Sequence, residues 1–257
     1  MKPLIKYPGG KRRQAAHIVD LALSYGRDSL VDLFVGGGSV ALEMLSRSER
    51  PRVTINDRQP LVAHLYDQIK YDWKTAYRVA SQPLTREEYL IEREQVKDAC
   101  QFWRVQRHAF NGLIRCGPRG FNVPFAKGNI QPMPSKAEVK AISIALRDVE
   151  IYSLDFDQVT IPKGAVIYCD PPYAKPGGFV GYGHAKWGLE DAKRFWAWAK
   201  WKSKRNPMII SYRDKPSLRK LASQQGWIVE EVKARRSIGA STGGASHEGE
   251  LLIRTKK

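Results

Sequence analysis

Short apolar runs alternate with longer amphipathic stretches along most of the chain, and this pattern is typical of a parallel sheet whose strands are joined by helices. A helix is predicted over Leu189–Trp201. Strands are predicted over Ser29–Phe34, Arg52–Asn56, Val149–Leu154, Ala165–Cys169 and Met208–Ser211, with a closing pair over Trp227–Ala234 and Glu250–Arg254. The expected fold class is therefore α/β with a doubly wound, Rossmann-like sheet, whose ligands lie at the carboxyl ends of the strands.

The pattern changes after the second predicted strand. Residues Leu61–Cys100 are polar with a helical period, whereas Gln101–Lys127 is basic and interrupted by glycines. This change predicts a helical and hairpin insertion, residues 58–141, between two parts of the sheet domain, residues 1–57 and 142–257.

Composition limits the function classes. The 257 residues are 42% hydrophobic, which is enough for a real core. No run approaches the roughly 18 apolar residues of a membrane span, and the first residues lack the apolar region of a signal peptide, so a cytoplasmic protein without membrane contact is expected. Cys100, Cys116 and Cys169 lie too far apart in sequence for a typical metal motif, so no metal is expected.

The charge points to a polyanionic partner. The formal net charge is +17, and no acidic residue lies between Asp98 and Glu138. Basic and aromatic residues alternate in that stretch, namely Arg104, Arg107, Arg115, Arg119, Lys127 and Lys136 with Phe102, Trp103, Phe110, Phe121 and Phe125. Such a mixture indicates a DNA or RNA groove, and a solvated basic face is the alternative.

The run Ala165–Cys169 ends abruptly in Asp170-Pro171-Pro172-Tyr173. Pro172 fixes its own φ and disfavours the helical region for Pro171, so the backbone after Asp170 is extended and stiff. A carboxylate, a carbonyl and an aromatic ring within four residues provide two acceptors and a stacking face for a planar amino group. The motif therefore predicts a methyltransferase that acts on an amino group, and a rigid turn at the end of a strand is the alternative.

A glycine loop, Gly36-Gly37-Gly38, follows the first predicted strand and opens a helix, so its backbone can approach a ligand closely. Asp57 comes 19 residues after Gly38, near the spacing of an acid that binds ribose hydroxyls. Because Gly36-x-Gly38-x-x-Ala41 also fits a dinucleotide fingerprint, this loop alone does not separate NAD from S-adenosylmethionine.

Several blocks together closely resemble the Dam family of DNA adenine-N6 methyltransferases. They are, in order, Lys6-Tyr7-Pro8-Gly9-Gly10-Lys11, Asp32-Leu33-Phe34-Val35-Gly36-Gly37-Gly38-Ser39, Asn111-Gly112-Leu113-Ile114-Arg115, Phe121-Asn122-Val123-Pro124-Phe125, Asp170-Pro171-Pro172-Tyr173, Arg235-Arg236-Ser237-Ile238 and Glu250-Leu251-Leu252. The resemblance is collinear from Lys6 to about Ile253. It implies transfer of a methyl group from S-adenosylmethionine to the N6 of an adenine flipped out of duplex DNA, in the site GATC. It also implies a bacterial or phage-infected host cell, and we expect a monomer.

The resemblance assigns roles to individual residues. The cofactor site would comprise Tyr7, Lys11, Asp32, Phe34, Gly36, Gly38, Asp57 and Asp170, and the catalytic motif Asp170, Pro171, Pro172 and Tyr173. The DNA-binding set would be Lys6, Phe110, Asn111, Leu113, Arg115, Arg119, Asn122 and Pro124. Within it, Lys6 and Arg115 would contact guanines, Leu113 and Pro124 the thymine methyl, and Phe110 would intercalate with Asn111 near the unpaired base.

Three alternatives stay open from the residues. Related Asp-Pro-Pro-Tyr motifs serve other planar amino acceptors, so an RNA base or a protein glutamine is a possible substrate class. A DNA-binding protein without catalysis could keep the same fold, although the intact Asp170 and Tyr173 argue against it. An oxidoreductase would leave the Asp-Pro-Pro-Tyr edge unexplained.

Overall fold

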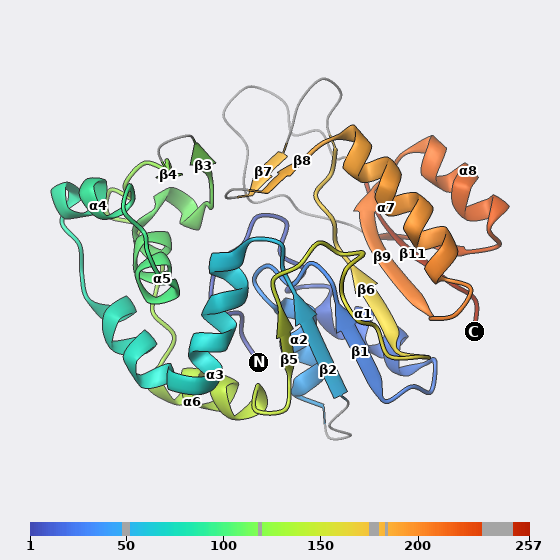
Figure 1. The fold of residues 1–257 in the computed structure, drawn as a ribbon, viewed down its shortest axis with the longest axis horizontal. Coiled ribbons are helices and arrows are strands. Elements are labelled where there is room, and N and C mark those ends of the chain that lie inside the picture. Colours follow the sequence, from blue (N-terminus) through green and yellow to red (C-terminus); the bar gives the residue numbers. More distant parts are fainter. Residues whose placement is uncertain (48–51, 118–119, 175–179, 183–184, 233–248) are drawn as a thin grey trace.

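The computed structural model describes residues 1–47, 52–117, 120–174, 180–182, 185–232 and 249–257. Within these ranges one sheet of seven strands forms the centre of the molecule (Figure 1). In chain order its strands are β1 (Ser29–Asp32), β2 (Arg52–Asn56), β5 (Glu150–Tyr152), β6 (Val166–Cys169), β9 (Met208–Arg213), β10 (Ile228–Val232) and β11 (Glu250–Arg254). The strands are short, and those in the middle of the sheet are almost entirely buried, as expected for a sheet that is covered on both faces.

The strand order across the sheet is β10-β11-β9-β6-β1-β2-β5. Neighbours from β5 to β9 pair in parallel, whereas β11 pairs antiparallel with both β9 and β10. From β1 the chain adds β2 and β5 on one side of β1, and it then crosses back to place β6 and β9 on the other side. The carboxyl ends of β1 and β6 therefore form the switch point at which an open α/β sheet binds its ligand.

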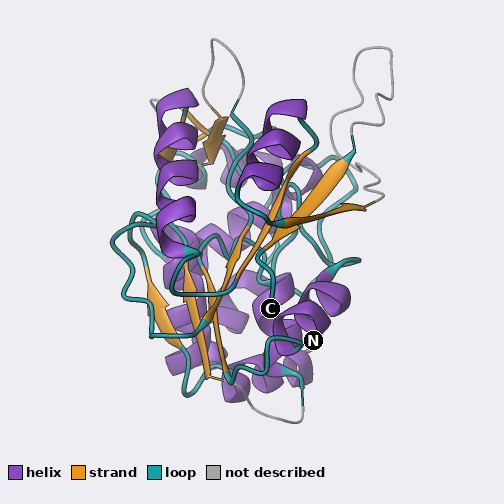
Figure 2. Cartoon of the chain, turned by 90° about the vertical axis from the view of Figure 1, so that its right-hand side faces the viewer, coloured by secondary structure: helices purple, strands orange, loops and turns teal. Residues whose placement is uncertain are grey.

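Helices cover both faces of the sheet, as Figure 2 shows. The helices on one face, or extending from it, are α1 (Ala15–Leu23), α2 (Ser39–Leu45), α3 (Pro60–Ser81), α5 (Ala99–His108) and α6 (Lys136–Ala145), and those on the other are α7 (Leu189–Lys202) and α8 (Pro216–Gln224). Alternate residues of β6 serve the two faces: Val166 and Tyr168 join one hydrophobic cluster, and Ile167 and Cys169 the other. This double coverage confirms the predicted fold class.

A group of smaller elements lies to one side of the sheet in Figure 1. It comprises α4 (Arg86–Glu92), the second half of α3, α5, the 3₁₀ turn η1 (Phe110–Gly112) and the hairpin of β3 (Cys116–Gly117) and β4 (Gly120–Phe121). Helix α3 links this group to the sheet and is interrupted at Asp72, whose φ of −146° is not helical. A second hairpin, β7 (Val180–Tyr182) and β8 (Ala185–Trp187), follows the Asp-Pro-Pro-Tyr motif.

The predicted elements are present with small shifts at their ends, and the hairpin is confirmed between Cys116 and Phe121. The predicted helical stretch Leu61–Cys100 contains α3, α4 and the start of α5 as separate helices, and α5 extends into the first part of the basic segment Gln101–Lys127. In the part of the chain that the structure describes, no helix combines the length and apolar character needed to cross a membrane.

Candidate active site and DNA interface

A large cavity of about 1140 Å³ lies at the switch point of the sheet. Its walls come from the N-terminal segment before α1, the loop after β1, the ends of β2 and β6, the loop after β5, and the start of β11. Segments that are far apart in sequence meet here because the carboxyl ends of the parallel strands share one edge. The cavity contains all the residues assigned by resemblance to the cofactor and catalytic sites except Gly38, which lies immediately behind its wall.

The glycine loop is shaped by two tyrosines. Gly36 has a φ of +47°, and a Cβ there would lie 2.9 Å from the ring of Tyr7. Gly38 has a φ of +76° and forms the N-cap of α2, and a Cβ there would collide with the hydroxyl of Tyr66. That hydroxyl donates to the carbonyl of Gly36 at 3.0 Å. Tyr7 therefore lies directly on the loop, where only glycine allows so close an approach.

Asp57 follows β2 and is fixed by backbone donors. Its Oδ2 accepts from the N–H of Gly36 at 2.9 Å, and its Oδ1 accepts from the N–H of Gln59 at 2.9 Å. The residue is buried, and burial raises the pKa of its carboxyl to about 6 in spite of these two donors. The acid predicted from spacing thus contacts the glycine loop itself, which fixes both parts of the cavity relative to each other.

Asp32, at the end of β1, is a buried carboxyl with an unused acceptor. It is 1% exposed, and its Oδ1 has no hydrogen-bond partner among the described residues. Burial and the negative charge of Asp170 raise the pKa of Asp32 to about 8. Since an unsatisfied buried acceptor costs free energy, this atom is available for a donor group of a bound molecule.

Asp170 follows β6 and is paired with Lys11 from the N-terminal segment. The Lys11 Nζ lies 2.7 Å from Asp170 Oδ2, 2.9 Å from Glu250 Oε1 and 2.9 Å from the carbonyl of Gly9. Burial raises the pKa of Asp170 to about 6, because the charge of Lys11 lowers it only in part and Glu250 raises it further. Asp170 is therefore largely ionised at neutral pH and sits close to a fixed cation.

Tyr173 is held at the same corner of the cavity. Its hydroxyl donates to Glu250 Oε1 at 2.5 Å, and its ring lies against Tyr212 of β9 with 4.9 Å between the ring centroids. The ammonium of Lys11 lies 5.9 Å from the centroid of the same ring. Three contacts thus fix the orientation of the aromatic side chain in the Asp-Pro-Pro-Tyr motif.

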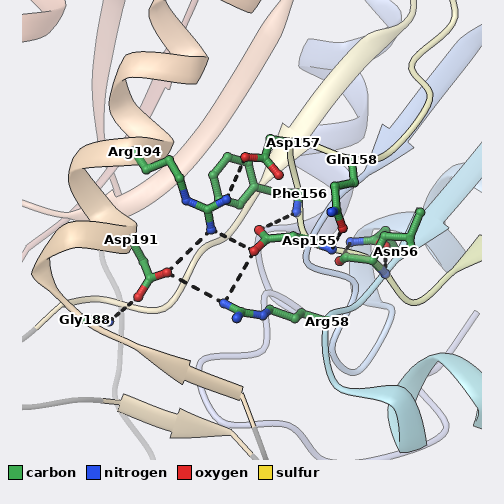
Figure 3. Close-up of polar contacts among 10 residues, drawn as sticks. Asn56, Arg58, Asp155, Phe156, Asp157, Gln158, Gly188, Asp191 and Arg194 are labelled. Carbon is green, nitrogen blue, oxygen red and sulfur yellow. Dashed lines mark hydrogen bonds and ion pairs between the residues drawn. The ribbon is translucent and has the colours of Figure 1, made fainter.

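The opposite wall combines aromatic and charged residues. Phe34 packs edge-on against Trp187 and Phe195, with centroid distances of 5.7 and 5.8 Å. Asp155, after β5, also lines the cavity and lies between two arginines (Figure 3). Arg194 of α7 contacts it at 2.7 Å and Arg58 at 3.6 Å.

Sequence reasoning missed Asp155, its two arginine neighbours and Glu250 as parts of the site or its support. The sequence carries a local signal of a site residue only for Asp155 and Glu250. Asp155 directly follows the predicted strand Val149–Leu154, and Glu250 begins the predicted strand Glu250–Arg254. Arg194 lies in a helix that the sequence marks only by its tryptophans, and its contact with Asp155 spans 39 residues.

The segment around the first hairpin presents some residues outward and buries others. Ile114, Phe121 and Val123 are buried, whereas Asn122 and Pro124 between and beside them are exposed. The Val123 carbonyl accepts from Tyr89 at 2.8 Å and from Arg93 at 3.0 Å, which fixes this strand-like segment. The exposed Arg115 donates through Nε to Asn122 Oδ1 at 2.8 Å and through Nη2 to the Asn122 carbonyl at 2.9 Å.

The turn η1 carries Phe110 and Asn111. Phe110 is 51% exposed although it is a large apolar side chain, and its N–H donates to the carbonyl of Pro124. Asn111 has a φ of +54°, so the backbone here is in a region that non-glycine residues rarely adopt. Gln106 connects this turn to the N-terminal segment by donating to the carbonyls of both Lys6 and Gly112. Leu113 is partly buried against the core, and Lys6 lines the cavity.

Part of the basic and aromatic stretch has a structural role, so only its remaining side chains are available for the predicted nucleic-acid groove. Phe102, Trp103 and Phe121 are buried in the core. Arg104 pairs with Glu92 and Gln82, and Arg107 donates to the carbonyls of Ala80 and Gln131. These contacts link α5 to α4, to the end of α3 and to the segment before α6. Arg119 lies outside the described residues.

Among the residues described, no cluster of histidine, cysteine, aspartate and glutamate has a geometry that could hold a metal ion. Cys100 and Cys169 are buried and unpaired, and burial raises the pKa of the Cys169 thiol well above its usual range. The part of the cavity around Asp170 contains carboxylates, the ammonium group of Lys11, tyrosines and the glycine loop.

Comparisons with known proteins agree on one family. A family model described as D12 class N6 adenine-specific DNA methyltransferase matches residues 7–238. The DNA adenine methylase of Serratia marcescens is 30% identical over 88% of each chain. The DNA adenine methylase of Haemophilus influenzae is 28% identical, and the match covers 92% of this chain and 87% of the relative. The DNA adenine methylase of Escherichia coli K12 is also 28% identical, and the match covers 88% of this chain and 85% of the relative. Because the family model matches most of the chain, the chain belongs to the D12 class of adenine-specific DNA methyltransferases, enzymes that methylate the N6 of adenine.

Proposed function

We propose that this enzyme transfers the methyl group of S-adenosylmethionine to the N6 of an adenine that is flipped out of a GATC site in duplex DNA. The observation that carries the proposal is the position of Asp170 and Tyr173 at one end of a cavity that also contains Asp57 and the loop at Gly36. A donor site and an amino-group site are thus adjacent.

The cavity fits the cofactor that a methyltransferase of this family requires. The unused Oδ1 of Asp32 suits the ammonium group of the amino-acid part, and Asp57 suits the ribose hydroxyls. The close contact of Tyr7 with Gly36 and the apolar wall at Phe34 suit the flat and apolar parts of the molecule. When bound, S-adenosylmethionine supplies a methyl group that is already electrophilic. The residues of the chain orient the adenine amino group and hold the proton that leaves it.

Asp170 and the carbonyl of Pro171 would each accept one N–H of the adenine amino group. Lys11 binds Asp170 through Oδ2, so Oδ1 is the oxygen that we assign to the adenine. Two acceptors favour a pyramidal nitrogen whose lone pair points toward the methyl group, and they stabilise the positive charge that develops on nitrogen. With a pKa of about 6, the Asp170 carboxyl can hold the proton that leaves N6 and release it to water near neutral pH.

Flipping the base costs a few kcal/mol in lost stacking and pairing. Stacking on Tyr173 would recover roughly 1–3 kcal/mol of that cost. Phe110, which is exposed in the free protein, would fill the gap in the duplex, with Asn111 next to the unpaired base. Its exposure supports this assignment, because a side chain that wedges between base pairs must be accessible.

Residues on the outer side of the hairpin support recognition of GATC. Arg115 is held by Asn122 in the free protein, so its guanidinium is already ordered when it meets a guanine. Pro124 is exposed beside it, and we assign Pro124 and Leu113 to the thymine methyl and Lys6 to the first guanine. We also assign Arg119 to DNA contact by resemblance. In this proposal residues 58–141 form the target-recognition part, and residues 1–57 and 142–257 the catalytic part.

We further propose that the enzyme acts as a monomer in the cytoplasm of a bacterial cell or of a bacterial cell infected by a phage. Gel filtration of the purified protein with and without a short duplex tests the monomer.

Digestion of DNA from cells that express the protein tests the target. We expect resistance to an endonuclease that is blocked by GATC methylation and sensitivity to one that requires it, with cells expressing Asp170→Ala as the control. Transfer of a labelled methyl group from S-adenosylmethionine to purified substrates complements the digestion. Label that enters duplex DNA only at sequences other than GATC would refute GATC as the target. Label that enters RNA or protein while duplex DNA stays unlabelled would refute DNA as the substrate class.

A further inference from the structure

Glu250 occupies the corner of the cavity behind the catalytic motif, yet none of the chemistry described so far uses it. It begins β11, and the next three residues are fully buried and apolar. Its carboxylate is 10% exposed and makes three contacts. Oε1 accepts from the Tyr173 hydroxyl at 2.5 Å and lies 2.9 Å from Lys11 Nζ, and Oε2 accepts from Gln14 at 3.1 Å.

Two of the groups that Glu250 contacts, Tyr173 and Lys11, also face Asp170. Tyr173 is the aromatic ring of the motif, and Lys11 is the cation that binds Asp170 at 2.7 Å. An ammonium group has three donors, and those of Lys11 have three acceptors: Gly9, Asp170 and Glu250. Because Glu250 takes one of these donors, Lys11 is shared between two carboxylates instead of pairing with Asp170 alone.

The backbone of Glu250 is fixed from both sides. In the register of the sheet it pairs with Arg213 of β9 on one side and with Val232 of β10 on the other, and the carbonyl of the preceding Gly249 accepts from Asp214. Packing alone does not require a carboxylate here, since replacing a buried ionic group by an apolar one is often neutral for stability. The location and partners of Glu250 point instead to the reaction.

We propose that Glu250 is a positioning residue for methyl transfer, which fixes the ring of Tyr173 through its hydroxyl and shares Lys11 with Asp170, so that Lys11 binds only Oδ2 of Asp170 and leaves Oδ1 to accept the amino group. This inference rests on the proposed function of Asp170 and Tyr173. It extends that function to a residue 77 positions from Tyr173 in sequence.

The charge of Glu250 has a second effect that a purely structural residue would lack. The groups that face Asp170 are Lys11 of the N-terminal segment, Asp32 of β1, Tyr168 of β6, Tyr173 and Glu250 of β11, and Arg213 of β9 lines the same cavity. The negative charge of Glu250 raises the pKa of Asp170. Burial opposes the ionisation of Glu250, but Lys11 and the Tyr173 hydroxyl hold the pKa of Glu250 below its usual range, so this charge persists at the pH of the reaction.

The test compares Glu250→Gln with Glu230→Gln, a matched change on the neighbouring strand β10. Glu230 pairs with the exposed His17 and does not line the cavity. Transfer of labelled methyl to unmethylated DNA of mixed sequence is measured as kcat from pH 5 to 8, together with the cofactor Kd and the thermal midpoint. The glutamine in Glu250→Gln keeps the size and one acceptor but removes the charge.

For Glu250→Gln we expect kcat to fall about tenfold with the cofactor Kd changed less than twofold, because a small loss of alignment is costly in catalysis. We also expect the acidic limb of the kcat profile to move to lower pH, because the charge that raises the pKa of Asp170 is gone. Glu230→Gln should match the wild type in kcat, in the pH profile of kcat, in the cofactor Kd and in the thermal midpoint. A Glu250→Gln variant with wild-type kcat and an unmoved acidic limb overturns the inference.

Tyr173→Phe provides an independent test that does not depend on how well the Glu250 variant folds. It keeps the ring but removes the hydroxyl, so we expect a lower kcat at an unchanged thermal midpoint. If Glu250 acts through this hydroxyl, the double variant loses little more activity than the worse single variant. Losses that multiply overturn the positioning of Tyr173. A wild-type protein that labels no DNA of any sequence refutes the proposed function itself, which distinguishes that failure from one of the inference.

Discussion

Substituting Gly38 by alanine tests how the glycine loop is shaped. Gly38 has a φ of +76°, and an added Cβ would collide with the hydroxyl of Tyr66. Tyr66 is buried and its hydroxyl donates to the carbonyl of Gly36, so the ring cannot move without breaking that bond. Two separate costs are therefore expected in the folded state.

The magnitude follows from these two costs. Placing an L-residue in the left-handed region costs about 1–2 kcal/mol. Displacing the Tyr66 hydroxyl leaves a buried carbonyl without its donor, at about 1–3 kcal/mol. We expect Gly38→Ala to lower the free energy of unfolding by about 2–5 kcal/mol.

Gly26→Ala is the matched control. Gly26 follows α1 with a φ of +65°, and no atom of the described residues lies within 4 Å of an added Cβ. It should therefore show the backbone cost alone, about 1–2 kcal/mol. Urea denaturation measures both variants, and Tyr66→Phe in the Gly38→Ala background should restore part of the loss because the colliding hydroxyl is gone. Equal losses for the two glycine variants would refute the contribution of Tyr66.

Three further predictions concern charged residues. Asp170→Ala should lower kcat at least about 10²-fold with duplex binding nearly unchanged. In the wild type, kcat should fall as the pH drops below about 6, because burial raises the pKa of Asp170 to that value. Normal turnover in the variant removes Asp170 from the mechanism. Burial raises the pKa of Asp32 to about 8 from 3.8, so its contribution to stability is full below about pH 4 and is lost as the pH rises through 8. Asp32→Asn should therefore gain stability relative to the wild type between pH 5 and 8 in thermal unfolding, and a constant difference contradicts this. Arg115→Ala should lose about 1–3 kcal/mol of selectivity at one base pair, measured with duplexes that carry single substitutions, and unchanged selectivity contradicts its role.

The sheet could be predicted from the sequence because its signals are local. The strands Arg52–Asn56 and Glu250–Arg254 have the predicted bounds, since each has β-branched or apolar residues in its middle and polar or charged residues at both ends. The glycine loop and the Asp-Pro-Pro-Tyr motif were likewise visible, because steric limits on glycine and proline act within a few residues. That Asp57 accepts from Gly36 agrees with their spacing.

The helical group beside the sheet was harder to predict because its side chains are ambiguous. Trp103 and Phe121 are aromatic residues beside arginines, which suits a nucleic-acid surface and a core equally well, and only the tertiary structure shows that they are buried. Glu250 could not be assigned a partner for a different reason. Its contact with Lys11 joins two ends of the described chain, and no local pattern encodes such a contact.

The Lys11 contacts also have a consequence for how the enzyme matures. Lys11 meets Asp170 across 159 residues, and Gln14 meets Glu250 across 236. Closing loops of this length costs chain entropy, and Glu250 begins strand β11, near the far end of the described chain. A chain that stops before β11 would retain the glycine loop and its helices but would lack the carboxylate that shares Lys11 with Asp170. We therefore expect truncated products of synthesis or proteolysis to be impaired in methyl transfer.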